Sequence, residues 1–115
     1  MEGIAGLIVL DRSQLRNVTL NDETLMREVV GALVNDASEQ IEELKIALQR
    51  ADSRECKRLA HGLMGACGNV GAVSLAALFG AIEHSASAGD LSFCRSSVEK
   101  LFVELEKLRQ EAGSI

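Results

Sequence analysis

The sequence contains no proline, no tryptophan and no tyrosine, and its only aromatic residues are three phenylalanines. The absence of proline removes the commonest breaker of helices. A β-sandwich would use more valine, threonine, tyrosine and tryptophan in its strands. The 115 residues, 47% of them hydrophobic, suffice for one domain with its own core. The composition therefore favours a single all-helical domain with a mostly aliphatic core.

Positive charge and long apolar runs are also scarce. Twelve lysine and arginine residues against 17 acidic residues give a formal net charge of −5. This balance disfavours non-specific nucleic-acid binding, because phosphate contacts need a basic surface. No apolar run approaches the roughly 18 residues of a membrane-spanning helix, and the apolar residues 4–10 lack the basic start of a signal peptide. We expect a cytoplasmic protein with no nucleic-acid partner and no direct membrane contact.

Cysteine and histidine occur in small numbers. The three cysteines, Cys56, Cys67 and Cys94, have no paired spacing, so we expect reduced thiols packed in the core. The two histidines, His61 and His84, form no His-x-x-x-His motif, and no Cys-x-x-Cys motif occurs. Neither a metal site nor a cofactor is therefore expected.

Apolar residues recur every three or four positions along most of the chain, which predicts amphipathic helices. The predicted helices cover residues 14–18, about 22–50, about 52–69, about 75–87 and about 91–108. Their expected end signals are N-caps at Asp11 or Ser13, Asp22, Asp52 (with Glu55 in capping-box position) and Asp90, and a left-handed residue at Gly71. Short connections make consecutive helices antiparallel neighbours. The predicted fold is all-α: an up-down four-helix bundle (residues 11–112) preceded by a short N-terminal helix, with residues 1–10 as an extension or linker remnant.

The stretch from Leu59 to Ala72 contains His61 and four of the ten glycines. A helical wheel places a buried side of Leu59, Leu63, Ala66 and Val70, with Cys56 and Cys67 at its margin. His61 lies nearly opposite. The side chains predicted to share its exposed side are Arg54, Lys57, Gly65 and Gly68, with Arg58 and Met64 on the flanks.

A lone histidine on a helix is most often a surface residue without a special role, and this is what we expect of His84. The neighbours of His61 indicate more. Glycine inside an exposed helix costs about 1 kcal/mol relative to alanine, and here it occurs at both Gly65 and Gly68, which suggests a surface cleared for a partner. Lys57 adds positive charge one helical turn before His61. An accessible imidazole beside a cation suits a nucleophile that receives an anionic group.

Residues 60–65, Ala-His-Gly-Leu-Met-Gly, resemble the Ala-His-x-Leu-Lys-Gly signature of the histidine-containing phosphotransfer (HPt) domain family. The match continues through Gly71-Ala72 and the leucine-rich segment after it. Leu10-Asp11 and Ala88-Gly89-Asp90 are also similar to the family, so the resemblance covers about residues 9–112.

The resemblance implies a phosphorelay intermediate that is a carrier and not an enzyme. His61 would accept a phosphoryl group from the aspartate of a receiver domain and pass it to another receiver. The implied partners are response-regulator receiver domains and hybrid sensor kinases, and the receiver would bring the Mg²⁺. No ATP-binding signature is present. The resemblance also leads us to expect a monomer, either free-standing or as part of a hybrid kinase.

One position departs from the family pattern: Met64 stands where lysine is usual. First, Lys57 or Arg54 could supply the missing charge from the preceding turns. Second, the domain could transfer phosphoryl groups more slowly or prefer one partner, with Met64 as a pliable apolar contact. Third, it could bind receivers without transferring a phosphoryl group. The alternative function is therefore a helical interaction module without phosphoryl chemistry, with a hydrolytic or metal enzyme more distant. In either binding role, receivers should dock around His61, where Arg54, Lys57 and Arg58 would complement an acidic active site.

Overall fold

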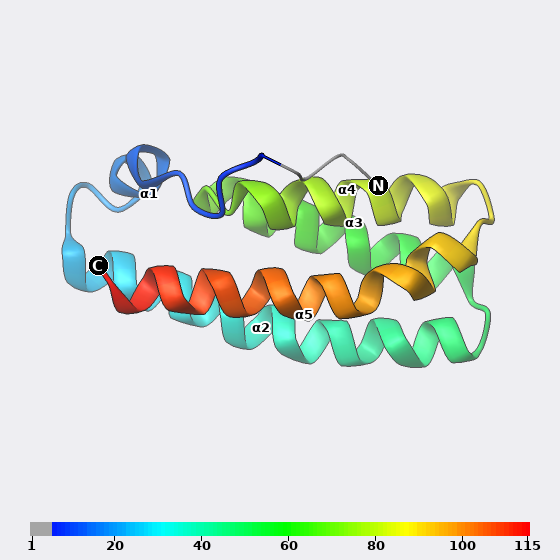
Figure 1. The fold of residues 1–115 in the computed structure, drawn as a ribbon. Coiled ribbons are helices and arrows are strands. Elements are labelled where there is room, and N and C mark those ends of the chain that lie inside the picture. The colour runs from blue at the N-terminus through cyan, green and yellow to red at the C-terminus, as the bar shows by residue number, and fades with distance from the viewer. Residues whose placement is uncertain (1–5) are drawn as a thin grey trace.

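The chain is described over residues 6–115 by a computed structural model, and this range is entirely helical apart from turns and the N-terminal segment. The helices are α1 (Arg12–Val18), α2 (Glu23–Gln49), α3 (Ser53–Val70), α4 (Val73–Ser87) and α5 (Leu91–Gly113). Figure 1 shows α2 to α5 lying lengthwise beside one another with alternating directions, and α1 at one end of the bundle. The predicted all-α bundle with a preceding short helix is confirmed.

Aspartate side chains begin four of the five helices. Asp11, Asp22, Asp52 and Asp90 each accept a hydrogen bond from the backbone N–H three residues later. At Asp52 the prediction of a full capping box is wrong. The Glu55 carboxylate binds Arg58, and the Asp52 N–H already donates to the carbonyl of Ala47. The predicted aspartate caps thus fix where the helices start, but the Glu55 side chain does not accept a hydrogen bond from the Asp52 N–H in return.

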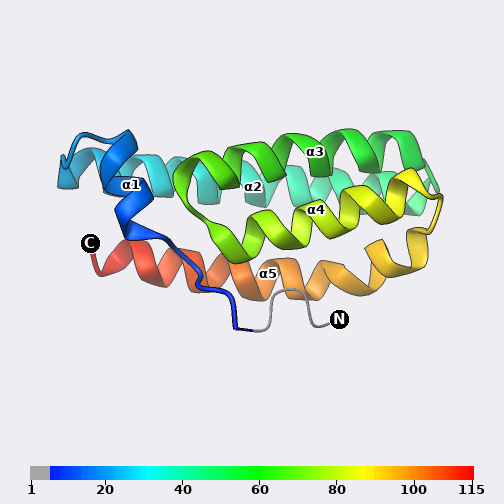
Figure 2. The ribbon, with the colours of Figure 1, turned by 90° about the horizontal axis from the view of Figure 1, so that it is seen from above.

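The length of the bundle follows from its longest helix. The 27 residues of α2 span about 40 Å at about 1.5 Å per residue, which matches the 42 Å long axis of the molecule. Around the bundle, α3 contacts α2 and α4, and α5 contacts α4 and α2. Gly71 and Ala72 alone connect α3 to α4, so these two helices pack closely side by side (Figure 2).

The core is aliphatic, as the composition predicts. Phe79 is the only phenylalanine among the fully buried side chains, and all three cysteines are buried. The predicted buried side of α3 needs a correction. Its fully buried residues are Cys56, Leu59, Ala60, Leu63 and Cys67, whereas Ala66 and Val70 are half-buried. Because α3 packs against both α2 and α4, its apolar face is broader than one stripe and is centred nearer the cysteines.

The segment before α1 is fastened to the turn between α3 and α4. The Asp11 N–H donates to the carbonyl of Gly71 at 2.8 Å, and the Ser74 N–H donates to the carbonyl of Ile8 at 3.1 Å. Gly71 has φ +91°, the predicted left-handed conformation, and a Cβ there would lie 2.8 Å from the Asp11 carbonyl oxygen. The close approach therefore requires glycine. Residues 1–5 of the predicted extension lie outside the described residues.

α1 is also tied to the far end of the chain. The Arg12 guanidinium donates to the Glu111 carboxylate at 3.1 Å and to the Ser114 hydroxyl. On the other side of α1, the Gln14 amide donates to the carbonyl oxygens of Gly68 and Asn69 at the end of α3. The short helix is thereby held at the end of the bundle where α3 and α5 finish (Figures 1 and 2).

Candidate functional site

His61 lies midway along α3 and points away from the core. Its side chain is 67% exposed, whereas its neighbour Ala60 and the residues Leu59 and Leu63 are buried. Buried and exposed residues lie on opposite sides of the same turn of α3, so the amphipathic pattern alone directs the imidazole to the surface. The predicted exposure of His61 is therefore confirmed.

Glu83 of α4 holds one side of the imidazole. His61 Nδ1 lies 2.9 Å from Glu83 Oε2, and the carboxylate is only 21% exposed. An ionised carboxylate can only accept a hydrogen bond, so Nδ1 carries the proton and donates. The other ring nitrogen, Nε2, then has its lone pair free. In a neutral imidazole the pair therefore favours the tautomer with Nδ1 protonated and Nε2 unprotonated, and it orients the ring.

Glu83 was not singled out from the sequence, although a signal for it exists. Helices α3 and α4 are antiparallel and joined by only two residues, so residues equally distant from the turn face each other. His61 lies ten positions before Gly71, and Glu83 lies eleven positions after Ala72. Counting outward from the turn places them at nearly the same level along the two helices, but does not tell which side of α4 faces His61.

Three basic residues precede His61 on the same exposed surface. Arg54, Lys57 and Arg58 line a groove together with His61 and Glu83. The Arg58 guanidinium donates two hydrogen bonds of 2.7 Å to Glu55, and this contact lowers the pKa of the Glu55 carboxyl. Within residues 6–115, Arg54 and Lys57 form no ion pair. Two uncompensated cations therefore lie in the groove beside the imidazole.

Met64 lies one turn after His61 and is half-buried. A Cβ built on Gly80 of α4 would lie 3.2 Å from the Met64 sulfur, so the thioether covers Gly80 in the seam between the two helices. Met64 therefore lies on the flank of the exposed face, as predicted. The surface around His61 is asymmetric: basic towards the start of α3 and apolar at Met64.

The glycine side of His61 is open. A Cβ at Gly65 or at Gly68 would meet nothing within 4 Å. Because Gln14 donates to the Gly68 carbonyl, α1 borders this surface. Close to α1, exposed apolar side chains occur at Val18, Leu20 and Leu25. All the residues predicted to surround His61 are thus on its exposed side or flank, and α1 extends the surface with apolar groups.

Other candidate groups do not form a second site. His84 is exposed, and within residues 6–115 its side chain has no hydrogen-bond partner. Burial raises the pKa of Cys67 to about 12 and is the main reason that the pKa of Cys94 rises to about 11. These thiols are therefore unreactive. The described part of the chain holds no cluster of metal-ligating side chains, and none of its helices has the length and apolarity to cross a bilayer.

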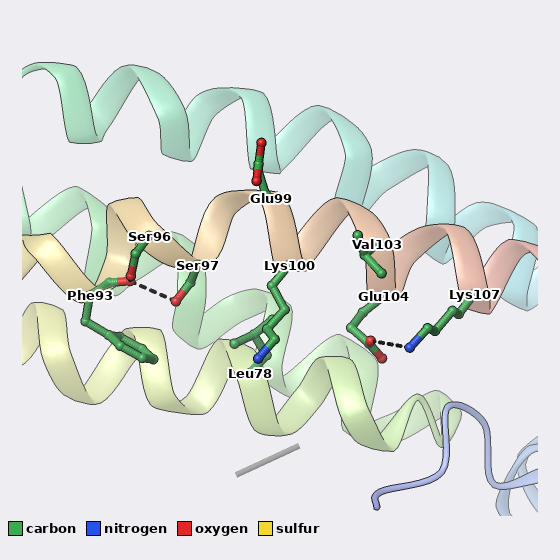
Figure 3. A pocket seen from close by; sticks show the side chains of 9 residues that line it. All are labelled: Leu78, Phe93, Ser96, Ser97, Glu99, Lys100, Val103, Glu104 and Lys107. Atoms are coloured by element: carbon green, nitrogen blue, oxygen red, sulfur yellow. Dashed lines mark hydrogen bonds and ion pairs between the residues drawn. The ribbon is translucent and has the colours of Figure 1, made fainter. Parts of the chain in front are cut away.

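A second groove lies between α4 and α5 and is shown in Figure 3. Its buried carboxylate, Glu104, accepts hydrogen bonds from Ser74 at 2.8 Å and from Lys107 at 3.0 Å. The Ser97 hydroxyl donates to the carbonyl of Phe93. Figure 3 shows the Ser97–Phe93 and Glu104–Lys107 contacts, and the lining contains no histidine or cysteine. The groove therefore offers no nucleophile comparable to His61.

Comparisons with known proteins found one matching family and one similar structure. A family model of the Hpt domain matches residues 28–112. The crystal structure of histidine-containing phosphotransfer protein B (HptB) from Pseudomonas aeruginosa PAO1 is similar, with a TM-score of 0.84 and 27% sequence identity over 96% of this chain and 99% of that chain. No curated protein matches the sequence significantly.

Proposed function

The chain belongs to the Hpt domain family, a family of phosphotransfer carriers in two-component signalling, and we propose that His61 is the residue that carries the phosphoryl group. The observation that supports this most is the pair between His61 and Glu83. It leaves Nε2 unprotonated and exposed on an otherwise cleared surface. No other nucleophilic side chain in residues 6–115 has such a setting.

The transfer would proceed by attack of Nε2 on the aspartyl phosphate of a receiver. The P–O bond to the aspartate breaks, the carboxylate leaves, and a P–N bond forms to His61. The imidazole becomes positively charged, and the Glu83 carboxylate, which already accepts the Nδ1 proton, stabilises that charge. Transfer to the next receiver is the same step in reverse. The receiver supplies Mg²⁺, which neutralises phosphoryl oxygens.

The charge that the family obtains from lysine at the Met64 position would come from Lys57 and Arg54. Lys57 is one turn before His61, a spacing that puts Cβ atoms about 5–6 Å apart on a helix surface. Both cations line the groove of His61 and lack an acidic partner in the described range. Arg58 is a weaker candidate because Glu55 already binds it. This is the first of the three explanations for Met64.

Receiver domains would dock over the exposed face of α3, from Arg54 to Gly68, and over the neighbouring end of α1. Leu20 supports the inclusion of α1. It is 88% exposed and has φ +54°, a left-handed conformation that costs a leucine roughly 1–2 kcal/mol. Backbone strain is concentrated at functional sites, and Leu20 forms a small exposed apolar group with Val18 and Leu25. Charge reversal by Lys57→Glu should weaken docking more at low salt than at high salt.

The proposed partners are receiver domains of response regulators and of hybrid sensor kinases. We propose that the carrier acts as a monomer in the cytoplasm without direct membrane contact. The monomer is supported by the burial of the large apolar side chains within the chain's own bundle. Apart from the group near α1, the exposed apolar side chains are scattered over different elements.

Transfer from a phosphorylated receiver tests the assignment. We expect the wild-type chain and His84→Gln to take up the phosphoryl group, and His61→Gln to take up none. His84→Gln is the matched control, since it removes the other histidine. If His61→Gln still passed phosphate between receivers, or if no receiver phosphorylated the wild-type chain, an interaction module without phosphoryl chemistry would replace the carrier.

A further inference from the structure

The groove at His61 combines a nucleophile with charges that match a phosphoryl group, all from this one chain. Arg54, Lys57, Arg58 and Glu83 line it together with His61. Arg58 is neutralised by Glu55 through two bonds of 2.7 Å, whereas Arg54 and Lys57 have no ion-pair partner in residues 6–115. Two unpaired cations in the groove of His61 match the double negative charge of a phosphoryl group.

The orientation of the imidazole is also provided within the chain. His61 Nδ1 lies 2.9 Å from Glu83 Oε2 and donates a hydrogen bond to that oxygen. The ring therefore needs no partner protein to select the reactive tautomer. The open side at Gly65 leaves space around the ring. Positioning and charge neutralisation are the main contributions to phosphoryl transfer. Both are present here before any receiver docks.

We propose that His61 also accepts a phosphoryl group directly from small phosphoramidates, without a receiver domain. This inference rests on the proposed role of His61 as acceptor and adds a second class of donor to the same site. A phosphoramidate exchanges one P–N bond for another, so the bond that forms is of the same type as the bond that breaks. The donor is small enough to enter the open groove of His61, whereas a receiver domain would have to dock over that groove.

The step is balanced without any further reactant. In its zwitterionic form phosphoramidate carries an ammonio group and a doubly negative phosphoryl group. Nε2 attacks the phosphorus, the donor's P–N bond breaks, and neutral ammonia leaves with the three protons that it already holds. The product is an N-phosphorylated imidazolium, whose Nδ1 proton stays on the hydrogen bond to Glu83. Arg54 and Lys57, which line the same groove, neutralise part of the charge of the phosphoryl group.

His84 is the internal control, because it is exposed on the same chain without a carboxylate partner among the described residues. The experiment incubates the intact protein with phosphoramidate in the presence of EDTA and follows each histidine by ³¹P NMR and by mass spectrometry of peptides. We expect His61 to react about tenfold faster than His84, since its groove neutralises the transferred group. In guanidinium chloride the two rates should become equal.

Variants separate the groove from simple exposure. Lys57→Ala and Glu83→Gln should each reduce the rate at His61 several-fold without changing the rate at His84. Lys100→Ala removes an exposed lysine of α5 and should change neither rate. Equal rates at the two histidines of the folded wild-type protein would overturn the inference. The same conclusion would follow if Lys57→Ala left their ratio unchanged.

Failure of this inference is distinguishable from failure of the proposed function. Transfer from a phosphorylated receiver to His61 is measured on the same preparations. If a receiver phosphorylates His61 but phosphoramidate reacts equally fast with His61 and His84, only the small-donor activity is wrong. If no receiver phosphorylates His61 either, the carrier assignment itself is wrong.

Discussion

Removal of the Glu83 carboxylate should slow phosphoryl transfer to His61. Glu83→Ala removes the carboxylate oxygen that lies 2.9 Å from His61 Nδ1, so the Nδ1 proton loses its hydrogen-bond acceptor. The ring can then turn, and its tautomers interconvert, so the fraction with an unprotonated Nε2 falls. The positive charge that develops on the ring also loses its counter-ion. The first effect lowers the population of the reactive form, and the second destabilises the transition state. Both should reduce the rate constant for transfer rather than the affinity for the receiver.

The size of this effect follows from the exposure of the pair. A hydrogen bond to a charged group contributes about 1.5–3 kcal/mol net. His61 is 67% exposed, so solvent screens the interaction and the lower end applies. A loss of about 1.4 kcal/mol corresponds to roughly a tenfold slower transfer. Glu83→Gln keeps an acceptor oxygen without the charge and should lie between the wild type and Glu83→Ala.

The assay is rapid-quench transfer from a phosphorylated receiver, with the receiver concentration varied to separate binding from transfer. Glu99→Ala, which removes an exposed glutamate of α5, serves as the control and should behave as the wild type. A Glu83→Ala rate constant within twofold of the wild type would refute the proposed role of the carboxylate. So would a loss that appeared only in the apparent affinity.

Three further predictions concern the charge, the turn and the thiols. Lys57→Ala should slow transfer several-fold, and adding Met64→Lys should restore most of the rate; no recovery would count against charge neutralisation from either position. Gly71→Ala should lower the free energy of unfolding by at least about 2 kcal/mol in urea titrations, because φ is +91° and its Cβ would clash with backbone. Gly62→Ala, in open space on α3, is its control and should not destabilise. With a pKa of about 12 in the folded state, Cys67 should react with a thiol reagent at pH 8 at least about 100-fold more slowly than in guanidinium chloride; comparable rates would contradict its burial.

Much of the fold follows from local signals in the sequence. Aspartate caps, the glycine at position 71 and the period of the apolar residues are sufficient to place the helices, because each acts within one or two turns. Short connections then leave few ways to pack four amphipathic helices. The exposure of His61 could be predicted for the same reason, since it depends only on which side of α3 is apolar.

The parts that could not be predicted depend on contacts between helices. The Glu83 carboxylate reaches His61 only through the register of α3 against α4, which the apolar period does not specify. The contact of Met64 with Gly80 has the same origin. The breadth of the buried face of α3 likewise reflects two neighbouring helices instead of one. A single wheel represents one helix and therefore misses all three.

The most direct test of the account is the identity of the phosphorylated atom. The protein would be labelled with ¹⁵N at histidine, phosphorylated by a receiver, and examined by long-range ¹H–¹⁵N and ³¹P NMR. We expect a single phosphoryl group on Nε2 of His61, with Nδ1 still protonated and hydrogen-bonded to Glu83. A phosphoryl group on Nδ1 of His61, on His84, or on no histidine would contradict it.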